Sequence, residues 1–338
     1  MAPTTGSQDA REATLEDFVT HDAAMQVCLD RARVAARTDL PVLILGESGT
    51  GKTLMARAIH NSSQRARGPF VSFNAAALSD TLLDSQLFGH ERGAFTGAQS
   101  RVKGKFELAD TGTLFLDEIA DLSPQGQSKI LRAIEYGEFE RLGSETIRTA
   151  DVRVLSATHY SVSTLTKDGK FREDLFYRIN GVTVNVPPLR NRPRDLPLLL
   201  ASEIARASRT QNKSIIGLDR QAADRLFTYH WPGNLRELSK VVQAAVALAT
   251  ADVIMPESLL LQADGMPSEA TAAQVAAPHG ASDSLLLKDA IHSHIRRVLD
   301  RVQGNKRRAA RELGVARATL ERKLEEMDAD ASKRKKRP

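Results

Sequence analysis

The sequence is poor in cysteine and lacks long apolar runs. A single cysteine, Cys28, excludes a disulfide-stabilised fold and any zinc site built from cysteines. No stretch approaches 18 consecutive apolar residues, so we expect no helix that spans a membrane. The N-terminal residues have neither the basic start nor the apolar run of a secretory signal. We therefore expect a soluble protein of a reducing, intracellular compartment.

The chain does contain enough apolar sequence for more than one core. Apolar residues make up 41% and charged residues 26% of the chain, which is typical of a globular protein. At roughly 150 residues per domain, the 338 residues suggest two domains or three small ones.

Positive charge is concentrated at the C-terminal end. Residues 285–338 hold 16 Lys and Arg against 8 Asp and Glu. Subtracting these from the 47 basic and 42 acidic residues of the whole chain leaves 31 and 34, so the remainder is nearly neutral. This distribution favours a C-terminal module that binds nucleic acid. A solvated basic tail is the alternative for the last six residues, KRKKRP.

Short apolar runs alternate with helix-like stretches from about residue 22 to residue 261. Five runs are typical of buried strands: PVLILG, PFVSFN, GTLFLDE, DVRVLSAT and GVTVNV. Their alternation with helical patterns predicts an α/β fold with a parallel sheet. After about residue 193 the strand-like runs stop, which predicts a helical subdomain behind the α/β core.

These patterns divide the chain into six segments. The first is too short to be a regulatory domain, so we expect none before the α/β subdomain. The fourth is rich in Ala, Ser, Pro and Gly and has no apolar stripe, which is typical of a flexible linker. We expect an N-terminal tail (1–20), an α/β subdomain (21–190), a helical subdomain (191–261), a linker (262–284), a helical DNA-binding domain (285–330) and a basic tail (331–338).

A glycine-rich loop follows the first strand-like run. Residues 46–53 match G-x-x-x-x-G-K-[ST], with a strand-like run before them and a helix-like stretch after them. Backbone N–H groups and Lys52 would hold the phosphates of ATP, and the Thr53 hydroxyl would bind Mg²⁺. The flanking elements argue against a chance turn. We expect nucleotide contacts from Gly46, Glu47, Ser48, Gly49, Thr50, Gly51, Lys52, Thr53 and Leu54.

A second nucleotide motif ends the run TLFLDE. Parallel strands bring their carboxyl ends to the edge of the sheet where ligands bind. We expect Asp117 to hold Mg²⁺ through water and Glu118 to polarise the water that attacks the phosphate. Alone, such a pair also fits acids near the start of a helix. Together with the glycine-rich loop, it predicts an ATPase site.

The chain resembles the bacterial enhancer-binding proteins, AAA+ ATPases that activate sigma-54 RNA polymerase. The resemblance covers about residues 22–261 and, separately, the C-terminus; it rests on LFGHERGAFTGA, GTLFLDEIADL, GEFERLG, FREDLFYRIN, PPLRNR and WPGNLREL. It implies an AAA+ P-loop core with a helical lid, followed by a Fis-like helix-turn-helix domain. It also implies self-association into a dimer and a ring, expected to be a hexamer, with ATP between subunits.

The hexapeptide GAFTGA is the most specific of these stretches. Taken alone, its two glycines around Phe95 and Thr96 fit a mobile loop tip, or a surface turn whose phenylalanine packs into the core. The resemblance implies that it contacts sigma-54 through Gly93, Ala94, Phe95, Thr96, Gly97 and Ala98.

The resemblance assigns roles to three arginines. Arg172 and Arg178 would be arginine fingers that reach the γ-phosphate held by a neighbouring subunit. A local salt bridge with Glu173 or Asp174 is the alternative for either. Arg236 resembles the sensor arginine that lies on the lid over the nucleotide of its own subunit.

Three polar positions bear on how ATP hydrolysis is controlled. Asn74 matches the family's asparagine that hydrogen-bonds Glu118, or it is a turn residue at a strand end. Thr53 occupies the position after the loop lysine, where the family usually has Glu. Threonine is the usual residue at this position in P-loops generally. His159 replaces the usual Asn of the sensor I motif. A histidine offers one donor and one acceptor and can titrate, so sensing of the γ-phosphate would be weaker or pH-dependent.

The C-terminal segment has the pattern of a helix-turn-helix. A helix-like stretch ends at Gly304 and Asn305, and two further helical stretches follow around a turn at Gly314. A dimerisation hairpin with a charged face is the alternative, and dimerisation is expected in either case. We expect contacts to DNA bases and phosphates from Arg317, Thr319, Arg322 and Lys323.

Together these features predict an ATP-hydrolysing activator. It would bind upstream enhancer DNA and remodel the closed complex of the sigma-54 RNA polymerase holoenzyme. We expect it in the bacterial cytoplasm, associated with the nucleoid, and controlled by a separate regulatory protein or by expression level. One alternative is a non-catalytic DNA-binding regulator that senses a ligand, which His159 favours. The other is an AAA+ motor with another client; GAFTGA argues against both.

Overall fold

The structure is a computed structural model that describes residues 13–76 and 79–262, together with Lys306 and Leu324. They form two compact units. One contains the chain up to Pro197 together with Trp231–Leu238, and the other contains Leu198–His230 and the chain from Ser239. The following expectations lie outside the described residues: the helix-turn-helix with Arg317, Thr319, Arg322 and Lys323, the basic tail, and all but the first residue of the linker.

A five-stranded parallel sheet forms the centre of the first unit. Its order is β2-β5-β8-β1-β9. The strands are β1 (Val42–Leu45), β2 (Phe70–Asn74), β5 (Thr113–Asp117), β8 (Arg153–Thr158) and β9 (Val182–Asn185). All five strand-like runs are therefore strands, and the predicted α/β fold with a parallel sheet is confirmed.

Alternate residues of these strands face two separate cores. Leu43, Leu114 and Leu116 pack into one hydrophobic cluster, whereas Val42, Ile44 and Phe115 pack into the other. This alternation follows from the two-residue period of a strand. It explains why the runs are mostly apolar and do not alternate with polar residues, since both faces of the sheet are covered by helices.

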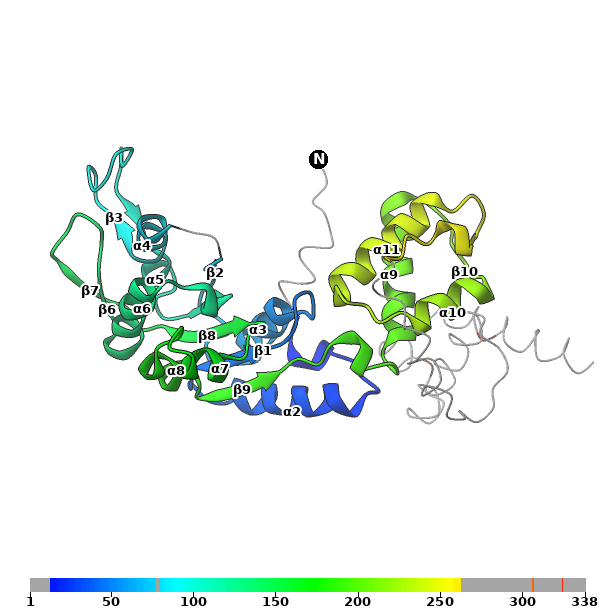
Figure 1. Ribbon diagram of the computed structural model, residues 1–338, viewed down its shortest axis with the longest axis horizontal. Helices are drawn as coiled ribbons and strands as arrows, with labels where there is room; N and C mark the ends of the chain where they lie inside the picture. The colour runs from blue at the N-terminus through cyan, green and yellow to red at the C-terminus, as the bar shows by residue number, and fades with distance from the viewer. Residues whose placement is uncertain (1–12, 77–78, 263–305, 307–323, 325–338) are drawn as a thin grey trace, which may run out of the picture. The chain divides into compact units, whose positions relative to one another are not determined.

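The helices divide between the two faces (Figure 1). One cluster takes its helical residues from η1 (Leu15–Asp17), α2 (Ala23–Ala36) and α3 (Lys52–Asn61). The other takes them from α4 (Asp80–Phe88), α5 (Lys105–Leu108), α6 (Pro124–Tyr136), α7 (Val162–Lys167) and α8 (Glu173–Ile179). The 3-10 turns η2 (Ile119–Asp121) and η3 (Leu189–Asn191) follow β5 and β9 along the chain.

Two small antiparallel hairpins interrupt this α/β pattern. One pairs β3 (Gly89–His90) with β4 (Val102–Lys103), and the other pairs β6 (Glu138–Glu140) with β7 (Ile147–Thr149). The loops of both hairpins extend away from the central sheet (Figure 1). The GAFTGA hexapeptide therefore lies in an insertion and not in the core.

The second unit is mainly helical. It is formed by most of α9 (Leu196–Gln211), α10 (Arg220–Thr228) and most of α11 (Asn234–Leu248), with η4 (Pro256–Ser258) after them. The expectation that strands stop after residue 193 needs one correction. A short parallel pair joins β10 (Gly217–Leu218) to β11 (Val253–Ile254). Two residues per strand carry too little periodicity for a sequence pattern to reveal them.

Lys213 links the end of α9 to the end of α11. Asn212 adopts a left-handed conformation with φ of +52° just after α9 ends. The following Lys213 Nζ donates hydrogen bonds to the carbonyls of Val246, Ala247 and Ala249 at 2.9, 2.6 and 2.9 Å. A cation at the C-terminus of a helix meets unpaired carbonyls and the negative end of the helix dipole.

We predict that Lys213→Met destabilises the second unit by about 1–2 kcal/mol, because three charge-assisted hydrogen bonds are lost while the aliphatic stem remains. Urea unfolding followed by circular dichroism measures the change. Lys240→Met is the matched control, because Lys240 is exposed on α11 and forms no hydrogen bond or ion pair within the described residues. Equal stability of the two variants would contradict the capping role.

Candidate functional site

The glycine-rich loop lies between β1 and α3. Gly49 and Gly51 have φ of +79° and +98°, a region that other residues adopt at a cost. A Cβ on Gly49 would lie only 2.3 Å from the carbonyl oxygen of Gly233. Glycine at this position is therefore required by the backbone conformation and by close packing against residues 231–235, which we call the lid turn.

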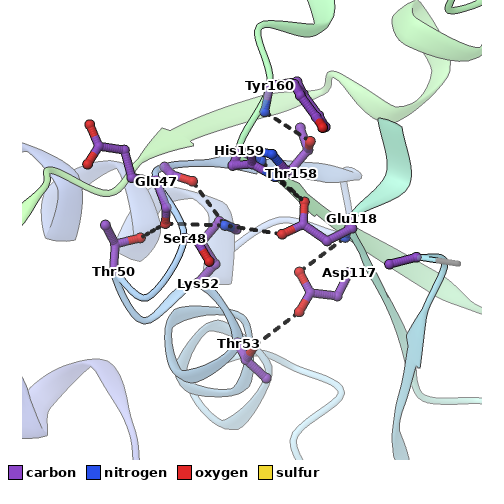
Figure 2. Close-up of polar contacts among 12 residues, drawn as sticks. Glu47, Ser48, Thr50, Lys52, Thr53, Asp117, Glu118, Thr158, His159 and Tyr160 are labelled. Carbon is purple, nitrogen blue, oxygen red and sulfur yellow. Dashed lines mark hydrogen bonds and ion pairs between the residues drawn. The ribbon is translucent and has the colours of Figure 1, made fainter. Parts of the chain in front are cut away.

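Lys52 begins α3, and its side chain folds back into the loop. Only 6% of the residue is exposed. Its ammonium donates to the carbonyl oxygens of Gly46 and Glu47 at 2.9 and 3.3 Å and lies 3.7 Å from Glu118 Oε1 (Figure 2). A buried cation held at a helix N-terminus is suited to bind phosphate.

Asp117 and Thr53 form an oxygen pair beside this lysine. The Thr53 hydroxyl donates to Asp117 Oδ2 at 3.4 Å (Figure 2). Burial, and then the nearby charge of Glu118, raise the pKa of Asp117 above its usual value. Among the described residues there is no cluster of three or more His, Cys, Asp or Glu that could hold a metal. Two protein oxygens next to a phosphate site suit Mg²⁺, which keeps several waters and binds phosphate oxygens.

Glu118 is held at both carboxylate oxygens. Its backbone is left-handed, with φ of +53°, directly after β5. Oε1 faces Lys52, and Oε2 accepts from the His159 Nδ1–H at 2.8 Å and weakly from the His159 backbone N–H at 3.4 Å (Figure 2). The carboxylate therefore has a fixed position next to the phosphate site.

The expected hydrogen bond between Asn74 and Glu118 is not formed. Asn74 ends β2 beside Asp117, but its Oδ1 accepts from the backbone N–H of Ala76 at 2.8 Å. The alternative for Asn74, a turn residue at a strand end, fits this contact. In this structure the Glu118 carboxylate is contacted by His159 and Lys52 instead.

The hydrogen bond from His159 to Glu118 uses the only N–H of a neutral imidazole, whereas an asparagine amide has two N–H groups. With Nδ1–H donated to the carboxylate, a neutral imidazole has only an acceptor at Nε2. It therefore has no side-chain donor left for a phosphate oxygen unless it is protonated. Its ring lies on Tyr160, with 3.8 Å between ring centroids.

Arg236 completes a small cavity. It lies in the first turn of α11, and its Nη1 donates to Ser48 Oγ at 2.7 Å. The phosphate cavity, as we call it, has a volume of about 170 Å³. Its lining residues are Ser48, Gly49, Gly51, Lys52, Thr53, Asp117, Glu118 and Arg236.

Arg172 and Arg178 are engaged elsewhere. Arg172 pairs with Asp174 through two hydrogen bonds of 3.0 and 2.6 Å and is about half exposed. Arg178 donates to the carbonyls of Ile134 and Glu135, both at 3.1 Å, near the C-terminus of α6. Within the described chain neither arginine contacts the glycine-rich loop, and the expected alternative of a local salt bridge is seen for Arg172.

The GAFTGA loop, residues 93–98, forms the tip of the β3–β4 hairpin. It is closed by hydrogen bonds from the Gly93 N–H to the Ala98 carbonyl at 2.9 Å and from the Ala98 N–H to the Phe95 carbonyl at 3.0 Å. Thr96 is exposed, whereas Phe95 is partly buried against His90, with ring centroids 5.0 Å apart. Phe95 therefore neither enters the core nor projects freely.

The base of this hairpin is attached to the β6–β7 hairpin. The Glu91 N–H donates to the Leu142 carbonyl and the Leu142 N–H to the Gly89 carbonyl, both at 3.0 Å. Arg141 is fully buried and binds Glu91 at 2.8 Å and, more tightly, Glu107. The stem is thus fixed, while a Cβ on Gly93 or Gly97 would meet nothing within 4 Å.

Two residues that contact the glycine-rich loop had no role assigned from the sequence. Arg190 and Asn234 both bind Glu47. The stretches PPLRNR and WPGNLREL were recognised as family-like, but nothing in their spacing indicates that they meet at the same loop.

The sheet order, the glycine-rich loop before α3 and the arginine at the start of α11 define a P-loop ATPase of the AAA+ class. Family comparison agrees. The sigma-54 interaction domain matches residues 18–185, the AAA+ ATPase lid domain residues 190–276, and the bacterial regulatory protein, Fis family, residues 292–327. Among residues 13–76 and 79–262, no helix has the length and apolar character needed to cross a membrane.

Known regulators are similar over most of their length. The transcriptional regulatory protein ZraR of Klebsiella oxytoca is 46% identical over 307 residues, or 91% of this chain and 68% of ZraR. The DNA-binding transcriptional regulator NtrC of Azospirillum brasilense is 41% identical over 324 residues, or 88% of this chain and 67% of NtrC. The crystal structure of NtrX from Brucella abortus in complex with ATP superposes with a TM-score of 0.68 at 31% identity, over 95% of this chain and 71% of NtrX.

The chain belongs to the sigma-54-dependent transcription activators, an AAA+ family. It is an ATP-dependent activator with a Fis-type helix-turn-helix for DNA, as expected from the sequence.

We predict that two substitutions in the cavity separate nucleotide binding from hydrolysis. Lys52→Ala removes the buried cation and should weaken ATP binding about 100-fold. Glu118→Gln should bind ATP within about twofold of the parent but hydrolyse it about 100-fold more slowly, because the water loses its polarising carboxylate. Calorimetry and phosphate release measure the two effects.

Asp121→Asn is the control for the second substitution. Asp121 is exposed three residues after Glu118 and does not line the cavity, so the same change from carboxylate to amide should leave turnover unchanged. Normal turnover of Glu118→Gln would contradict the role given to Glu118.

Proposed function

We propose that this protein hydrolyses ATP at the phosphate cavity and uses hydrolysis to move the GAFTGA loop against sigma-54. The single observation that supports this best is the combination of Lys52, Asp117, Glu118 and Arg236 around one cavity. The GAFTGA hairpin belongs to the same compact unit.

Each residue has a definite part in the proposed reaction. Lys52 attracts the β- and γ-phosphates, and Glu118 orients and polarises the attacking water. His159 holds Glu118 in place, and Arg236 approaches the phosphates from the side of Ser48. Phosphoryl transfer depends mostly on positioning and charge stabilisation, which is what these fixed side chains supply.

Mg²⁺ is the metal that fits beside these residues. Thr53 and Asp117 would hold it, the aspartate through water. When bound, it neutralises charge on the β- and γ-phosphate oxygens. The raised pKa of Asp117 reflects burial and the Glu118 charge, which a bound cation would offset.

The arginine fingers would come from a neighbouring subunit. Because neither Arg172 nor Arg178 contacts the phosphate cavity of its own chain, a role in catalysis requires a second copy. Arg172 is the more available of the two, since its partners Asp174 and Ser128 are surface side chains, whereas Arg178 binds two main-chain carbonyls. A ring with ATP at each interface, most simply a hexamer, meets this requirement.

The C-terminal module would select the promoter. Residues 285–338, the DNA-binding domain and the basic tail together, hold 16 Lys and Arg against 8 Asp and Glu. We propose that they bind enhancer DNA as a dimer in the bacterial cytoplasm, joined through the linker 262–284 to the ATPase subdomain 21–190 and its lid 191–261. The proposed DNA contacts are Arg317, Thr319, Arg322 and Lys323.

We predict that Thr96→Ala uncouples the ATPase from the polymerase. Thr96 is exposed at the hairpin tip and does not line the phosphate cavity, so turnover should stay within about twofold. Binding to sigma-54 in the presence of an ATP transition-state analogue should be lost. Ser100→Ala, which removes another exposed hydroxyl from the same hairpin, is the control. Unchanged sigma-54 binding by Thr96→Ala would rule out this loop as the contact.

We predict that Arg172→Ala subunits bind ATP normally but hydrolyse it about a thousandfold more slowly. Adding Lys52→Ala subunits should restore part of the activity. These subunits retain Arg172, which can reach the intact cavity of a neighbouring Arg172→Ala subunit. A double variant, Lys52→Ala with Arg172→Ala, lacks this arginine and should restore no activity. Absence of rescue at every mixing ratio would show that Arg172 acts within its own chain.

A further inference from the structure

Glu47 is the second residue of the glycine-rich loop, yet its side chain does not enter the phosphate cavity. Figure 2 shows its carboxylate directed away from Lys52 and Glu118. Arg190, in η3, binds this carboxylate with both terminal nitrogens, at 2.7 Å to Oε2 and 2.5 Å to Oε1. The hydrogen bond from Arg190 also lowers the pKa of Glu47. Such two-point contacts fix geometry more strictly than a single ion pair does.

Asn234 joins the same carboxylate to the lid turn. It is completely buried. Its Nδ2 donates to Glu47 Oε2 at 3.2 Å and to the Ser48 carbonyl at 3.1 Å, and its Oδ1 accepts from the Leu189 N–H at 2.8 Å. Its backbone is left-handed, with φ of +50°, a conformation that asparagine tolerates better than most residues. One side chain therefore connects three segments that are far apart in the sequence.

The lid turn also pairs with the backbone of the loop. The Leu235 N–H donates to the Gly49 carbonyl at 3.0 Å. The carbonyls of Ser48 and Gly49 are thus both bound to lid-turn residues, while both residues also line the phosphate cavity. Arg236 directly follows this turn, in the first turn of α11, and binds Ser48 Oγ at 2.7 Å. The loop and Arg236 are accordingly held by one network.

We propose that Glu47, Arg190 and Asn234 are positioning residues that fix the loop in its phosphate-binding shape and hold Arg236 beside it before nucleotide arrives. The inference rests on the proposed nucleotide site but not on hydrolysis. A loop that becomes ordered only when nucleotide binds loses conformational entropy, and this loss lowers the affinity. A loop that is already ordered therefore binds nucleotide more tightly. The chemical step is unaffected once ATP is bound, because none of the three residues lines the cavity.

The test compares Glu47→Gln, Arg190→Met and the double variant by calorimetry with ADP and with ATP. Each single substitution should raise both dissociation constants about tenfold, and the double variant should be no weaker than the weaker single one. At saturating ATP, kcat should stay within about twofold while KM rises. Arg194→Met, an exposed arginine whose side chain makes no contact with the loop among the described residues, should change nothing.

Other outcomes would overturn the proposal. Dissociation constants within twofold of the parent would show that Glu47 and Arg190 do not hold the loop in its binding shape, and additive effects in the double variant would show that the two do not act as a unit. A fall in kcat at unchanged KM would place Glu47 in the chemical step. ADP binding requires no hydrolysis, so it tests the role of these residues separately from the proposed ATPase activity. If the parent protein binds nucleotide but does not hydrolyse ATP, the proposed ATPase activity is wrong, but the role of Glu47 and Arg190 in nucleotide binding is not contradicted.

Discussion

The parallel register of the central sheet is the constraint on which the nucleotide site depends. Leu45 pairs with Thr158, and Asn74 pairs with Asp117, so the glycine-rich loop, the Asp117–Glu118 pair and His159 all follow strands that end at one edge. A slip of one residue in β5 would turn the Asp117 and Glu118 side chains to the opposite faces of the sheet. The register is held because Phe115 and its neighbours Leu114 and Leu116 fill two different cores.

The GAFTGA hairpin combines a fixed stem with a tip at which Gly93, Thr96 and Gly97 are exposed. The stem is tied to the β6–β7 hairpin by backbone hydrogen bonds and by the buried Arg141, which binds two carboxylates. Breaking a buried pair by removing one partner is costly, so the stem should move as a unit. A nucleotide can shift such a loop only by binding more tightly to one of its arrangements than to another. In the proposed mechanism, the ATP and ADP states differ in this way.

The sequence was sufficient to predict the strands of the central sheet, but not the six short strands outside it or all the contacts. Buried strands have local signatures, so the five sheet strands were predicted correctly, and the glycine-rich loop lies between a strand and a helix as expected. The contact between His159 and Glu118, the capping of α6 by Arg178 and the binding of Glu47 by Asn234 depend on how distant segments pack. Periodicity and spacing carry no information about those distances. The resemblance to a family assigned Asn74 to Glu118, and the structure gives it a different partner.

Open-complex formation on a sigma-54 promoter most directly tests whether this protein activates the polymerase by hydrolysing ATP. Promoter melting by the sigma-54 holoenzyme would be followed with the intact protein and enhancer DNA, in ATP and in a non-hydrolysable analogue. Melting is expected with ATP and not with the analogue, since binding alone does not drive the loop through its cycle. Equal melting with the analogue, or none with ATP while nucleotide is bound, would contradict an activator that works by hydrolysis.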